Sequence, residues 1–352
     1  MSKISIYSHT QEQFVDALFA LCGKGRQHAA RLYAEWYRKG HLNDIREWVE
    51  PQAMPLVQKM IDAVEFSLPE MVTWREEGET AKFLLQFTDG LESESVLIPM
   101  ESGTTLCISS QIGCRMGCTF CETGKMGLIR HLSCEEIVAQ VFIARLRKDV
   151  RNIVFMGMGE PFDNYDVVMQ AVAVLTDPAG MGFGPSRITI STSGKVEGIV
   201  RMAREADPAL NLAVSINAPS DEVRRRLMPV NREANMATLK EAMLEYCSHP
   251  RRTILAEYVL IQGVNDSLDH ARQLAGYLEG LRVKLNLIPY NPQTRDRFAP
   301  PELETREAFF NEMRSLGVLT LLRGTKGQKI MAACGQLGNV EVRRKLFANR
   351  SN

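Results

Sequence analysis

The sequence predicts an α/β fold built on a parallel sheet, preceded by two smaller modules. From residue 104 onward, short apolar runs alternate with longer segments of helical periodicity, which is typical of strand–helix–strand units. Six strands, each followed by a helix, imply parallel pairing with right-handed crossovers. A chain of 352 residues is long enough for such a domain and an appendage. An open doubly wound sheet and a partial barrel both satisfy this pattern.

The amino-terminal part is predicted to be helical. Phe14, Leu18 and Leu21 recur at helical spacing, and further short helical patterns continue to about residue 64. We assign residues 1–66 to this module. It is either an element that docks RNA or a lid over the core.

A small β-extension is predicted to follow. Between residues 71 and 99 the hydrophobic period changes to two, and Asp89-Gly90 marks a hairpin turn. Residues 67–103 are therefore expected to form a few antiparallel strands that lead into the main domain.

The main domain is predicted to cover residues 104–322. Its expected strands are residues 105–108, 152–156, 187–192, 211–215, 254–261 and 284–289. Its expected helices are residues 134–146, 165–176, 195–206, 236–246, 267–278 and 306–316. Reactive groups in such folds gather at the carboxyl ends of the strands. The loops that follow the strands are therefore the expected place of a functional site.

Composition narrows the class of protein. Hydrophobic residues make up 45% and charged residues 24% of the chain, as in ordinary globular enzymes. No apolar run approaches the roughly 20 residues that span a bilayer, and the first residues lack the apolar core of a signal peptide. We therefore expect a cytoplasmic protein without membrane contact. The formal net charge is zero, so the whole-chain balance gives no support for RNA binding.

Three cysteines form the most specific motif. Five of the eight cysteines fall between residues 107 and 134, which favours reduced, chemically used thiols over a disulfide framework. Among them Cys114, Cys118 and Cys121 have the spacing C-x3-C-x2-C. Three thiols can ligate three irons of a cubane cluster and leave the fourth iron open. A structural zinc site would normally take four protein ligands in paired C-x2-C spacing, and no second pair or nearby His completes such a set. The spacing resembles the signature of radical S-adenosylmethionine (SAM) enzymes.

Polar residues at successive strand ends are candidate SAM contacts. Gly159 and Glu160 follow the second expected strand, where glycine lets the backbone approach a ligand and a carboxylate accepts hydrogen bonds from an ammonium group. Any one such residue alone would more often be a turn residue or helix cap. The further candidates at the ends of the third, fourth and sixth strands are Ser191, Ser215, Ile216, Asn217 and Asn291.

Two cysteines lie outside the cluster motif. Cys107 precedes the motif by seven residues, and Cys334 lies in the small-residue stretch Ala332-Ala333-Cys334-Gly335, which suits an active-site loop. A buried structural cysteine is the usual alternative for each.

These segments together resemble the RlmN/Cfr family of radical SAM RNA methyltransferases. The resemblance is carried by Cys107 and the cluster loop, Gly-Met-Gly-Glu-Pro at 157–161, Ser-Thr-Ser-Gly at 191–194, Leu-Ile-Pro-Tyr-Asn-Pro at 287–292 and Ala-Ala-Cys-Gly-Gln-Leu at 332–337. It favours a partial (β/α)6 TIM-like radical SAM barrel. The sequence is most similar to the RlmN branch, which methylates C2 of adenosine in 23S rRNA and in some tRNAs, whereas the Cfr branch methylates C8.

The resemblance implies one 4Fe-4S cluster, two molecules of SAM for each turnover and an external electron donor such as flavodoxin. It also implies that Cys334 is methylated on sulfur and carries the carbon to the adenine. Cys107 would then attack the Cys334 sulfur and release the RNA as a disulfide forms, which is exchange chemistry that needs an accessible thiolate. Glu94 matches the position of the general base, although alone it would be interpreted as an exposed strand carboxylate.

Two positions depart from the family pattern. Asn217 stands where the family usually has His, which removes a titratable group, and Glu122 adds a negative charge where a small residue is common. They leave the detailed SAM contacts open.

The carboxy-terminal segment, residues 323–352, supplies a local basic excess. From residue 321 to the end there are seven basic residues and one acidic residue, a net charge of +6. Such an excess favours phosphate contacts, and a solvated helix face is the alternative. Rival functions are C8 methylation and a catalytically silent RNA-binding or ribosome-assembly protein.

Overall fold

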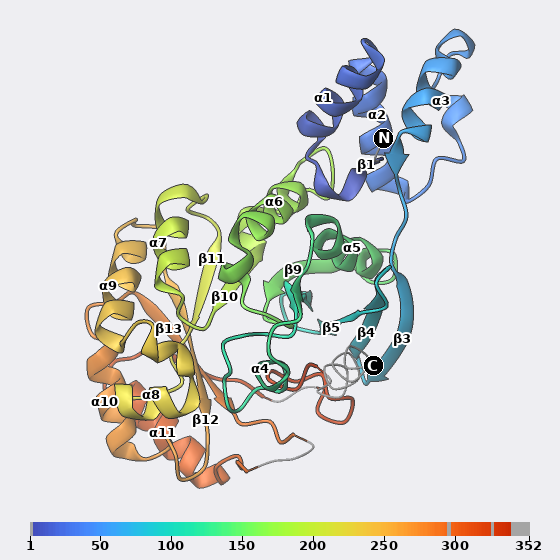
Figure 1. The fold of residues 1–352 in the computed structure, drawn as a ribbon. Helices are drawn as coiled ribbons and strands as arrows, with labels where there is room; N and C mark the ends of the chain where they lie inside the picture. The colour runs from blue at the N-terminus through green and yellow to red at the C-terminus, as the bar shows by residue number, and fades with distance from the viewer. Residues whose placement is uncertain (1–2, 294–296, 325–326, 339–352) are drawn as a thin grey trace, which may run out of the picture.

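A single large sheet forms the centre of the fold. The computed structural model describes residues 3–293, 297–324 and 327–338. In this part of the chain a ten-stranded sheet has the order β14-β13-β12-β11-β10-β9-β6-β5-β4-β3 (Figure 1). Its strands are β3 Glu70–Glu77, β4 Thr80–Gln86, β5 Glu92–Ile98, β6 Thr104–Cys107, β9 Val150–Phe155, β10 Ile188–Thr192, β11 Asn211–Ser215, β12 Ile254–Leu260, β13 Val283–Pro289 and β14 Thr320–Leu322.

Parallel strands β6 and β9 to β14 follow one another in sequence order across the sheet. A doubly wound sheet would reverse direction at a switch point, so this order confirms the partial barrel. Thr320–Leu322 corrects the expectation of six strands, because it is a seventh parallel strand that pairs with β13. The sequence did not indicate it because it has only three residues, two of them exposed.

The β-extension continues the same sheet rather than standing apart from it. Strands β3, β4 and β5 pair antiparallel with one another, and β5 pairs antiparallel with β6. This pairing places Glu94 on β5 one strand away from Cys107, since Val96 lies opposite Cys107 in the register.

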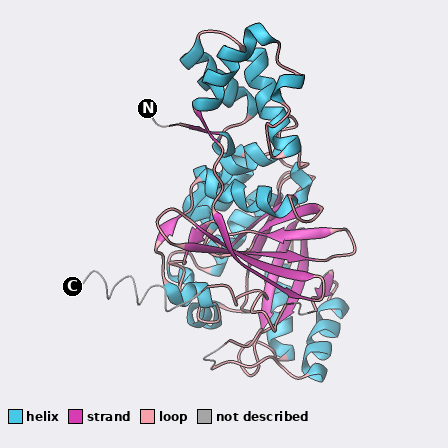
Figure 2. Ribbon diagram, turned by 90° about the vertical axis from the view of Figure 1, so that its right-hand side faces the viewer, coloured by secondary structure: helices cyan, strands magenta, loops and turns pink. Residues whose placement is uncertain are grey.

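The longer helices after the strands cover the outer face of the barrel (Figures 1 and 2). They are α5 Cys134–Arg145, α6 Tyr165–Thr176, α7 Val196–Glu205, α9 Met236–Cys247, α10 Leu268–Leu278 and α11 Leu303–Ser315. Two short helices, α4 Glu122–Met126 and α8 Asp221–Leu227, lie instead at the carboxyl ends of the strands. Helices α4 and α8 were not expected, because each spans fewer than eight residues. Two short pairs complete the strands of the described residues: β1 Ile4–Ser5 with β2 Val64–Glu65, and β7 Gln111–Ile112 with β8 Arg130–His131.

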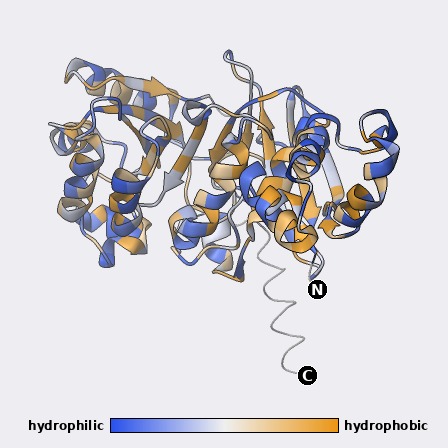
Figure 3. Cartoon of the chain, turned by 90° about the horizontal axis from the view of Figure 1, so that it is seen from above, coloured by the Kyte–Doolittle hydropathy of each residue, from blue (hydrophilic) through white to orange (hydrophobic). Residues whose placement is uncertain are grey.

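The amino-terminal helices α1 Gln11–Cys22, α2 Arg26–Lys39 and α3 Met54–Asp62 pack beside α5 and α6 (Figure 1). Aromatic contacts hold the two parts together. The ring centroids of Tyr7 and Phe142 on α5 lie 5.3 Å apart, and the Trp36 ring stacks on the Phe142 ring with their centroids 6.1 Å apart. Viewed from above, the helices carry hydrophilic and hydrophobic segments side by side (Figure 3). The docking or lid role of residues 1–66 stays a prediction.

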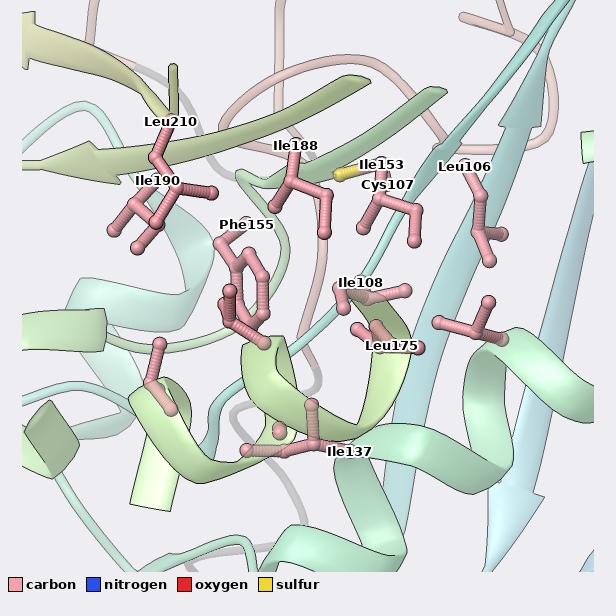
Figure 4. Packing of buried hydrophobic residues seen from close by; sticks show 14 of the residues in the cluster. Leu106, Cys107, Ile108, Ile137, Ile153, Phe155, Leu175, Ile188, Ile190 and Leu210 are labelled. Atoms are coloured by element: carbon pink, nitrogen blue, oxygen red, sulfur yellow. The ribbon is translucent and has the colours of Figure 1, made fainter. Parts of the chain in front are cut away.

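The core lies between the sheet and its outer helices (Figure 4). Side chains alternate across strand β6, so Leu106 and its neighbour Ile108 pack toward the helices while Cys107 faces the barrel interior. Figure 4 shows the Cys107 sulfur pointing away from Ile137 and Leu175. Within the described residues, no helix combines the length and the apolar character that crossing a membrane requires.

Candidate active site

The cluster loop is a tight turn between β7 and α4. Gly113 at its start has φ 73°, and a Cβ there would lie 1.9 Å from the carbonyl oxygen of Gly127, so only glycine fits. The loop is fixed by Cys114 N, which donates to Gly127 O at 3.1 Å, and by Thr119 N, which donates to Leu227 O at 2.9 Å. These contacts hold the three cysteines of the loop at the carboxyl end of the parallel sheet.

The Gly-Met-Gly-Glu-Pro segment lies against this loop. Gly159 has φ 109°, and a Cβ there would lie 2.7 Å from the Gln111 side chain. Glu160 is 2% exposed, and its carboxylate accepts hydrogen bonds from Ser193 N at 2.7 Å and Phe162 N at 3.1 Å. Burial raises the pKa of the Glu160 carboxyl above its usual range, although these hydrogen bonds lower it.

One cavity gathers most of the predicted site residues. It has a volume of about 160 Å³ and lies at the ends of β9 to β13. The predicted residues that line it are Cys114, Cys118, Cys121, Gly159, Glu160, Ser191, Ser215, Asn217, Asn291 and Cys334. Segments up to 220 positions apart in sequence thus meet in one place.

Ile216 is placed differently from its neighbours. Its side chain is fully buried and does not line the cavity. Its backbone N–H donates to Glu257 O at 2.9 Å, and its carbonyl accepts from Arg224 Nε at 3.2 Å. The backbone of Ile216 therefore links the end of β11 to β12 and α8. Its predicted SAM contact stays a prediction.

Asn217 adopts the left-handed conformation, with φ 55°, which Asn tolerates better than most residues. Its side-chain oxygen accepts from Val259 N at 2.8 Å, and its own carbonyl accepts from Asn265 Nδ2 at 2.9 Å. This side-chain amide thus fixes a turn at the cavity wall. Glu122, the other departure, forms an ion pair with Lys125 at 3.3 Å.

Contacts from distant segments hold Cys334 at the cavity. Asn291 Nδ2 donates to the Cys334 carbonyl at 3.1 Å, and Glu122 N donates to Gly335 O at 2.8 Å. Thr123 Oγ1 donates to Leu337 O at 2.5 Å. The loop that carries Cys334 is therefore bound directly to the helix that follows the cluster cysteines.

A second cavity of about 210 Å³ meets the first at Cys334 and Met156. Cys107 lines this second cavity, not the first. All eight cysteines are free thiols. Burial raises the pKa of the Cys107 thiol to about 12, and the Arg323 guanidinium acts in the opposite direction.

Glu94 lines neither cavity. Its side chain is 10% exposed and forms an ion pair of 2.5 Å with Lys82, and Glu94 Oε1 accepts from Gly338 N at 3.0 Å. Lys82 Nζ also donates to Met331 O at 2.9 Å. The pair thus binds both ends of the loop that carries Cys334. The general-base role of Glu94 stays a prediction.

Sequence reasoning did not place three charged residues at the cavities, although it counted one of them, Arg323, in the basic segment. Glu257 on β12 lines the first cavity and is 5% exposed, and Asn286 Nδ2 donates to it at 2.8 Å. Arg323 lines the second cavity, with its guanidinium 3.7 Å from the Glu257 carboxylate. A lone carboxylate within the apolar strand ILAEYVL was the available signal for Glu257.

Arg224 of α8 is the third missed residue, and it is fully buried. It donates to the carbonyls of Ser193 at 2.6 Å and Ser215 at 3.2 Å. It therefore ties together two strand ends at the cavity wall. Its sequence neighbourhood of three consecutive arginines gave no sign that one of them is internal.

Comparison with known proteins decides the family. The family model described as the radical SAM superfamily matches residues 108–275. A probable dual-specificity RNA methyltransferase RlmN 1 of Protochlamydia amoebophila (strain UWE25) is 54% identical, with 97% of this chain and 96% of the relative covered. The chain belongs to the RlmN family of radical SAM RNA methyltransferases.

Two further relatives match nearly the whole length of this chain. The dual-specificity RNA methyltransferase RlmN of Geotalea uraniireducens (strain Rf4) is 40% identical over 96% of this chain and 97% of its own. The crystal structure of a radical SAM methyltransferase from Sphaerobacter thermophilus is 38% identical, with a TM-score of 0.88 over 95% of this chain and 98% of its own.

The 4Fe-4S cluster and SAM that membership of the RlmN family implies fit the residues present. Three thiols line one cavity, and burial raises the pKa of Cys114 and Cys118, a cost that coordination to a metal offsets because a coordinated thiol is deprotonated. Among the described residues no three His, Cys, Asp or Glu side chains converge on a single metal ion. A cubane does not require such convergence, because each thiolate binds a different iron.

Much of the predicted basic segment lies outside the described residues. Lys326, Arg343, Arg344, Lys345 and Arg350 fall there, whereas Arg323 and Lys329 are described. Lys329 N donates to Glu77 on β3 at 2.8 Å.

Proposed function

We propose that this RlmN-family chain methylates C2 of adenosine in 23S rRNA and in tRNA, with Cys334 as the carrier of the methyl carbon. The position of Cys334 carries this proposal, since it lines the cavity of the three cluster cysteines and also the cavity of Cys107. A carrier must reach the radical source on one side and the resolving thiol on the other. The names of the full-length relatives support an RNA substrate.

When bound, one SAM would supply the methyl group for the Cys334 sulfur, and a second SAM with the reduced cluster would supply a 5′-deoxyadenosyl radical able to remove one hydrogen atom from the S-methyl group. The residues of this chain do the rest. Cys114, Cys118 and Cys121 would hold the cluster. Glu160 offers its carboxylate to the SAM ammonium group, and the strand-end residues Ser191, Ser215, Asn217 and Asn291 line the space for its remaining groups.

The carbon attached to Cys334 adds to the electron-poor C2 of adenine and forms a covalent protein–RNA adduct. The adduct would then pass one electron to the cluster, which was oxidised when SAM was cleaved, and lose the ring proton, for which we propose Glu94 as the base. The Cys107 thiolate then attacks the Cys334 sulfur, the sulfur–carbon bond breaks, and the released carbon takes up a proton to become the methyl group. The disulfide that forms must be reduced before the next turnover.

The proposal also names the electron donor, the number of SAM molecules used and the cellular compartment. An external one-electron donor such as flavodoxin reduces the cluster, each turnover uses two molecules of SAM, and the protein works in the cytoplasm, where thiols are kept reduced. Five free thiols in and beside the two cavities support a reducing compartment.

Nucleoside mass spectrometry tests the function. The anaerobically reconstituted protein is given SAM, a reductant and unmodified 23S rRNA or tRNA, and we expect 2-methyladenosine. Formation of 8-methyladenosine alone would reassign the chain to C8 chemistry. RNA binding without consumption of SAM, or a preparation that holds no iron and sulfide, would instead indicate a catalytically silent RNA-binding protein.

The Cys107→Ala variant tests the role of the resolving thiol in the same assay. Without the attacking thiolate the adduct has no route to a disulfide, so we expect an RNA–protein crosslink at Cys334 and little free product. Clean product formation by this variant would refute the resolving role of Cys107.

A further inference from the structure

The two cavities that meet at Cys334 differ in charge and in the end of the barrel at which they lie. The first cavity lies at the carboxyl ends of β9 to β13, and its charged lining residues in the described chain are Glu160 and Glu257. In the second cavity the charged lining residues of the described chain are Arg187 and Arg323. A cation such as SAM therefore suits the first cavity, whereas an anion suits the second.

The second cavity reaches the barrel interior from the opposite end of the sheet. Its outer part is lined by residues that precede the parallel strands or lie early in them, namely Ser102, Thr105, Asn152, Ser186 and Arg187. Ser102, Ser186 and Arg187 are exposed, so they form a mouth at the amino ends of β6 and β10. Barrel interiors are normally filled by packed side chains at this end, whereas here a volume of about 210 Å³ is open.

Cys107 and Cys334 line the inner part of this cavity. Cys107 is the last residue of β6, three residues after Thr104, so at about 3.3 Å per residue it lies roughly 10 Å above the start of the strand. Its sulfur points into the barrel interior, away from the outer helices (Figure 4). A disulfide between the two cysteines would therefore lie at the inner end of a deep, narrow passage.

We propose that the second cavity is the entrance for a small anionic thiol that reduces the Cys107–Cys334 disulfide after each turnover. The inference rests on the function proposed above, which forms that disulfide. A protein reductant carries its reactive thiol on its own surface and does not fit into a passage of this depth and volume. The two arginines attract the carboxylates of a small thiol, and Arg187 at the mouth meets them first.

The reduction proceeds by two thiol exchanges. The thiolate of the small molecule attacks the Cys107 sulfur, a new sulfur–sulfur bond forms, and Cys334 leaves as a thiolate. Arg323 lines the same cavity, and its positive charge stabilises that thiolate. A second small thiolate attacks the sulfur of the first and frees Cys107. The two freed thiolates take up the protons that the small thiols lost, so two small thiols are oxidised to one disulfide while the protein disulfide is reduced.

Thiols of different charge test the inference. The reconstituted full-length protein completes one turnover on RNA without added thiol, and RNA and free reductant are then removed. The probes are 2-mercaptoethanesulfonate, 2-mercaptoethanol and cysteamine, which are anionic, neutral and cationic. Alkylation followed by mass spectrometry measures how fast each probe reduces the Cys107–Cys334 disulfide. The rate of the same probe with hydroxyethyl disulfide corrects for its intrinsic reactivity.

We expect the corrected rate to be about tenfold higher for the anionic than for the neutral probe, and lowest for the cationic probe, because a positive cavity concentrates anions. High salt should reduce this difference, since it screens the charges at the mouth.

Arg187→Glu tests the charge at the mouth. We expect the preference for the anionic probe to fall by about tenfold, because a carboxylate replaces the guanidinium at the entrance. Arg251→Glu is the matched control, since Arg251 is exposed before β12 at the same end of the sheet and lines neither cavity. It should keep the wild-type preference.

Ser186→Trp tests the passage itself, because a large side chain at the mouth should block it. We expect reduction by 2-mercaptoethanesulfonate to be slower by roughly tenfold, since exchange requires access to the sulfur. The amount of RNA methylated in a single turnover should be unchanged, which shows that the variant is folded and active. Ser248→Trp is the matched control, since Ser248 is exposed at the end of α9 and lines neither cavity. It should behave as wild type in both measurements.

The outcomes separate this inference from the proposed function. Equal corrected rates for the three probes, together with unhindered reduction in Ser186→Trp, would overturn the inference and leave the methyltransferase function standing. Thioredoxin that reduces wild type and Ser186→Trp equally well, while small thiols act slowly on both, would place reduction on the side of the first cavity and also overturn it. Loss of single-turnover methylation in Ser186→Trp would assign the cavity to the RNA reaction instead. Wild-type protein that modifies no RNA would overturn both.

Discussion

The cluster loop and the loop that carries Cys334 reach the same cavity by opposite means. The three cluster cysteines span eight residues, and their arrangement follows from local spacing and from the turn at Gly113. Cys334 depends on partners far away in the sequence, including Asn291, 43 positions away, and the Lys82–Glu94 pair on the β-extension. The arrangement of the three cysteines that we propose as cluster ligands is therefore largely a local property, whereas the position of Cys334 is set by tertiary contacts.

Because of this difference, substitutions in the two loops should impair different steps of the reaction. Damage to the cluster loop should remove the radical source and every later step. Damage around the second loop should leave the cluster intact and change only the transfer of carbon. The following predictions are arranged from the largest expected effect to the smallest.

Cys118→Ser should abolish all activity. Loss of one of three thiolates removes a ligand that the described residues do not replace, so we expect the cluster to be lost or held weakly. Iron and sulfide analysis together with 5′-deoxyadenosine formation measures this. A variant that retains a full cluster would contradict the assignment of the ligand set.

Cys334→Ala should form neither methylated RNA nor a crosslink, while iron content stays at the wild-type level. The physical reason is that the variant has no sulfur to carry the carbon, although the three cluster thiols are untouched. Nucleoside mass spectrometry and iron analysis on one preparation give both values. Methylated RNA from this variant would point to direct transfer from SAM.

Release of the adduct by Cys107 should accelerate with pH. Burial raises the pKa of this thiol to about 12, so at pH 7 to 9 the thiol is mostly protonated and each pH unit increases the reactive thiolate about tenfold. Acid quenching of single turnovers at several pH values measures the decay of the adduct. Thiols bound to iron should show no such dependence, so iron content serves as the control. A rate independent of pH would mean that another group deprotonates Cys107 before the attack.

Lys82→Met should loosen the second loop and leave the first unchanged. The side chains of Lys82 and Glu94 are each 10% exposed, and removal of one member of a buried ion pair costs about 3 kcal/mol. We expect this loss in urea denaturation, and an RNA methylation rate lower by about tenfold because the carrier is less well positioned. Unchanged stability and rate would show that the pair does not position the loop.

Two further variants complete that comparison. Arg204→Met removes an exposed pair with Glu245 and should leave the urea midpoint unchanged.

Glu94→Gln distinguishes a positioning role of Glu94 from a role as the base. Accumulation of the protein–RNA adduct in this variant, but not in Lys82→Met, would support the role as the base.

Long, strongly periodic segments were predictable from the sequence. The helix expected at residues 165–176 is α6 with the same bounds, and the six expected parallel strands are present. The short elements α8 and β14 were not predicted, because so few residues show no hydrophobic periodicity. Glu94 shows the same limit at the site. Its spacing from Cys107 is a sequence property, but its pairing with Lys82 depends on the register of β4 and β5.

The sequence by itself determined the alternation of strands and helices, the spacing of the three predicted cluster cysteines and the presence of two outlying thiols. Covalent spacing and hydrophobic period act over a few residues, so they can be followed along the chain. Only the tertiary structure decided that Cys334 stands between two cavities of opposite charge, with Glu257 and Arg323 3.7 Å apart at their boundary. Glu257 on β12 and Arg323, which directly follows β14, are 66 positions apart, and it is the pairing of β12, β13 and β14 that brings them together.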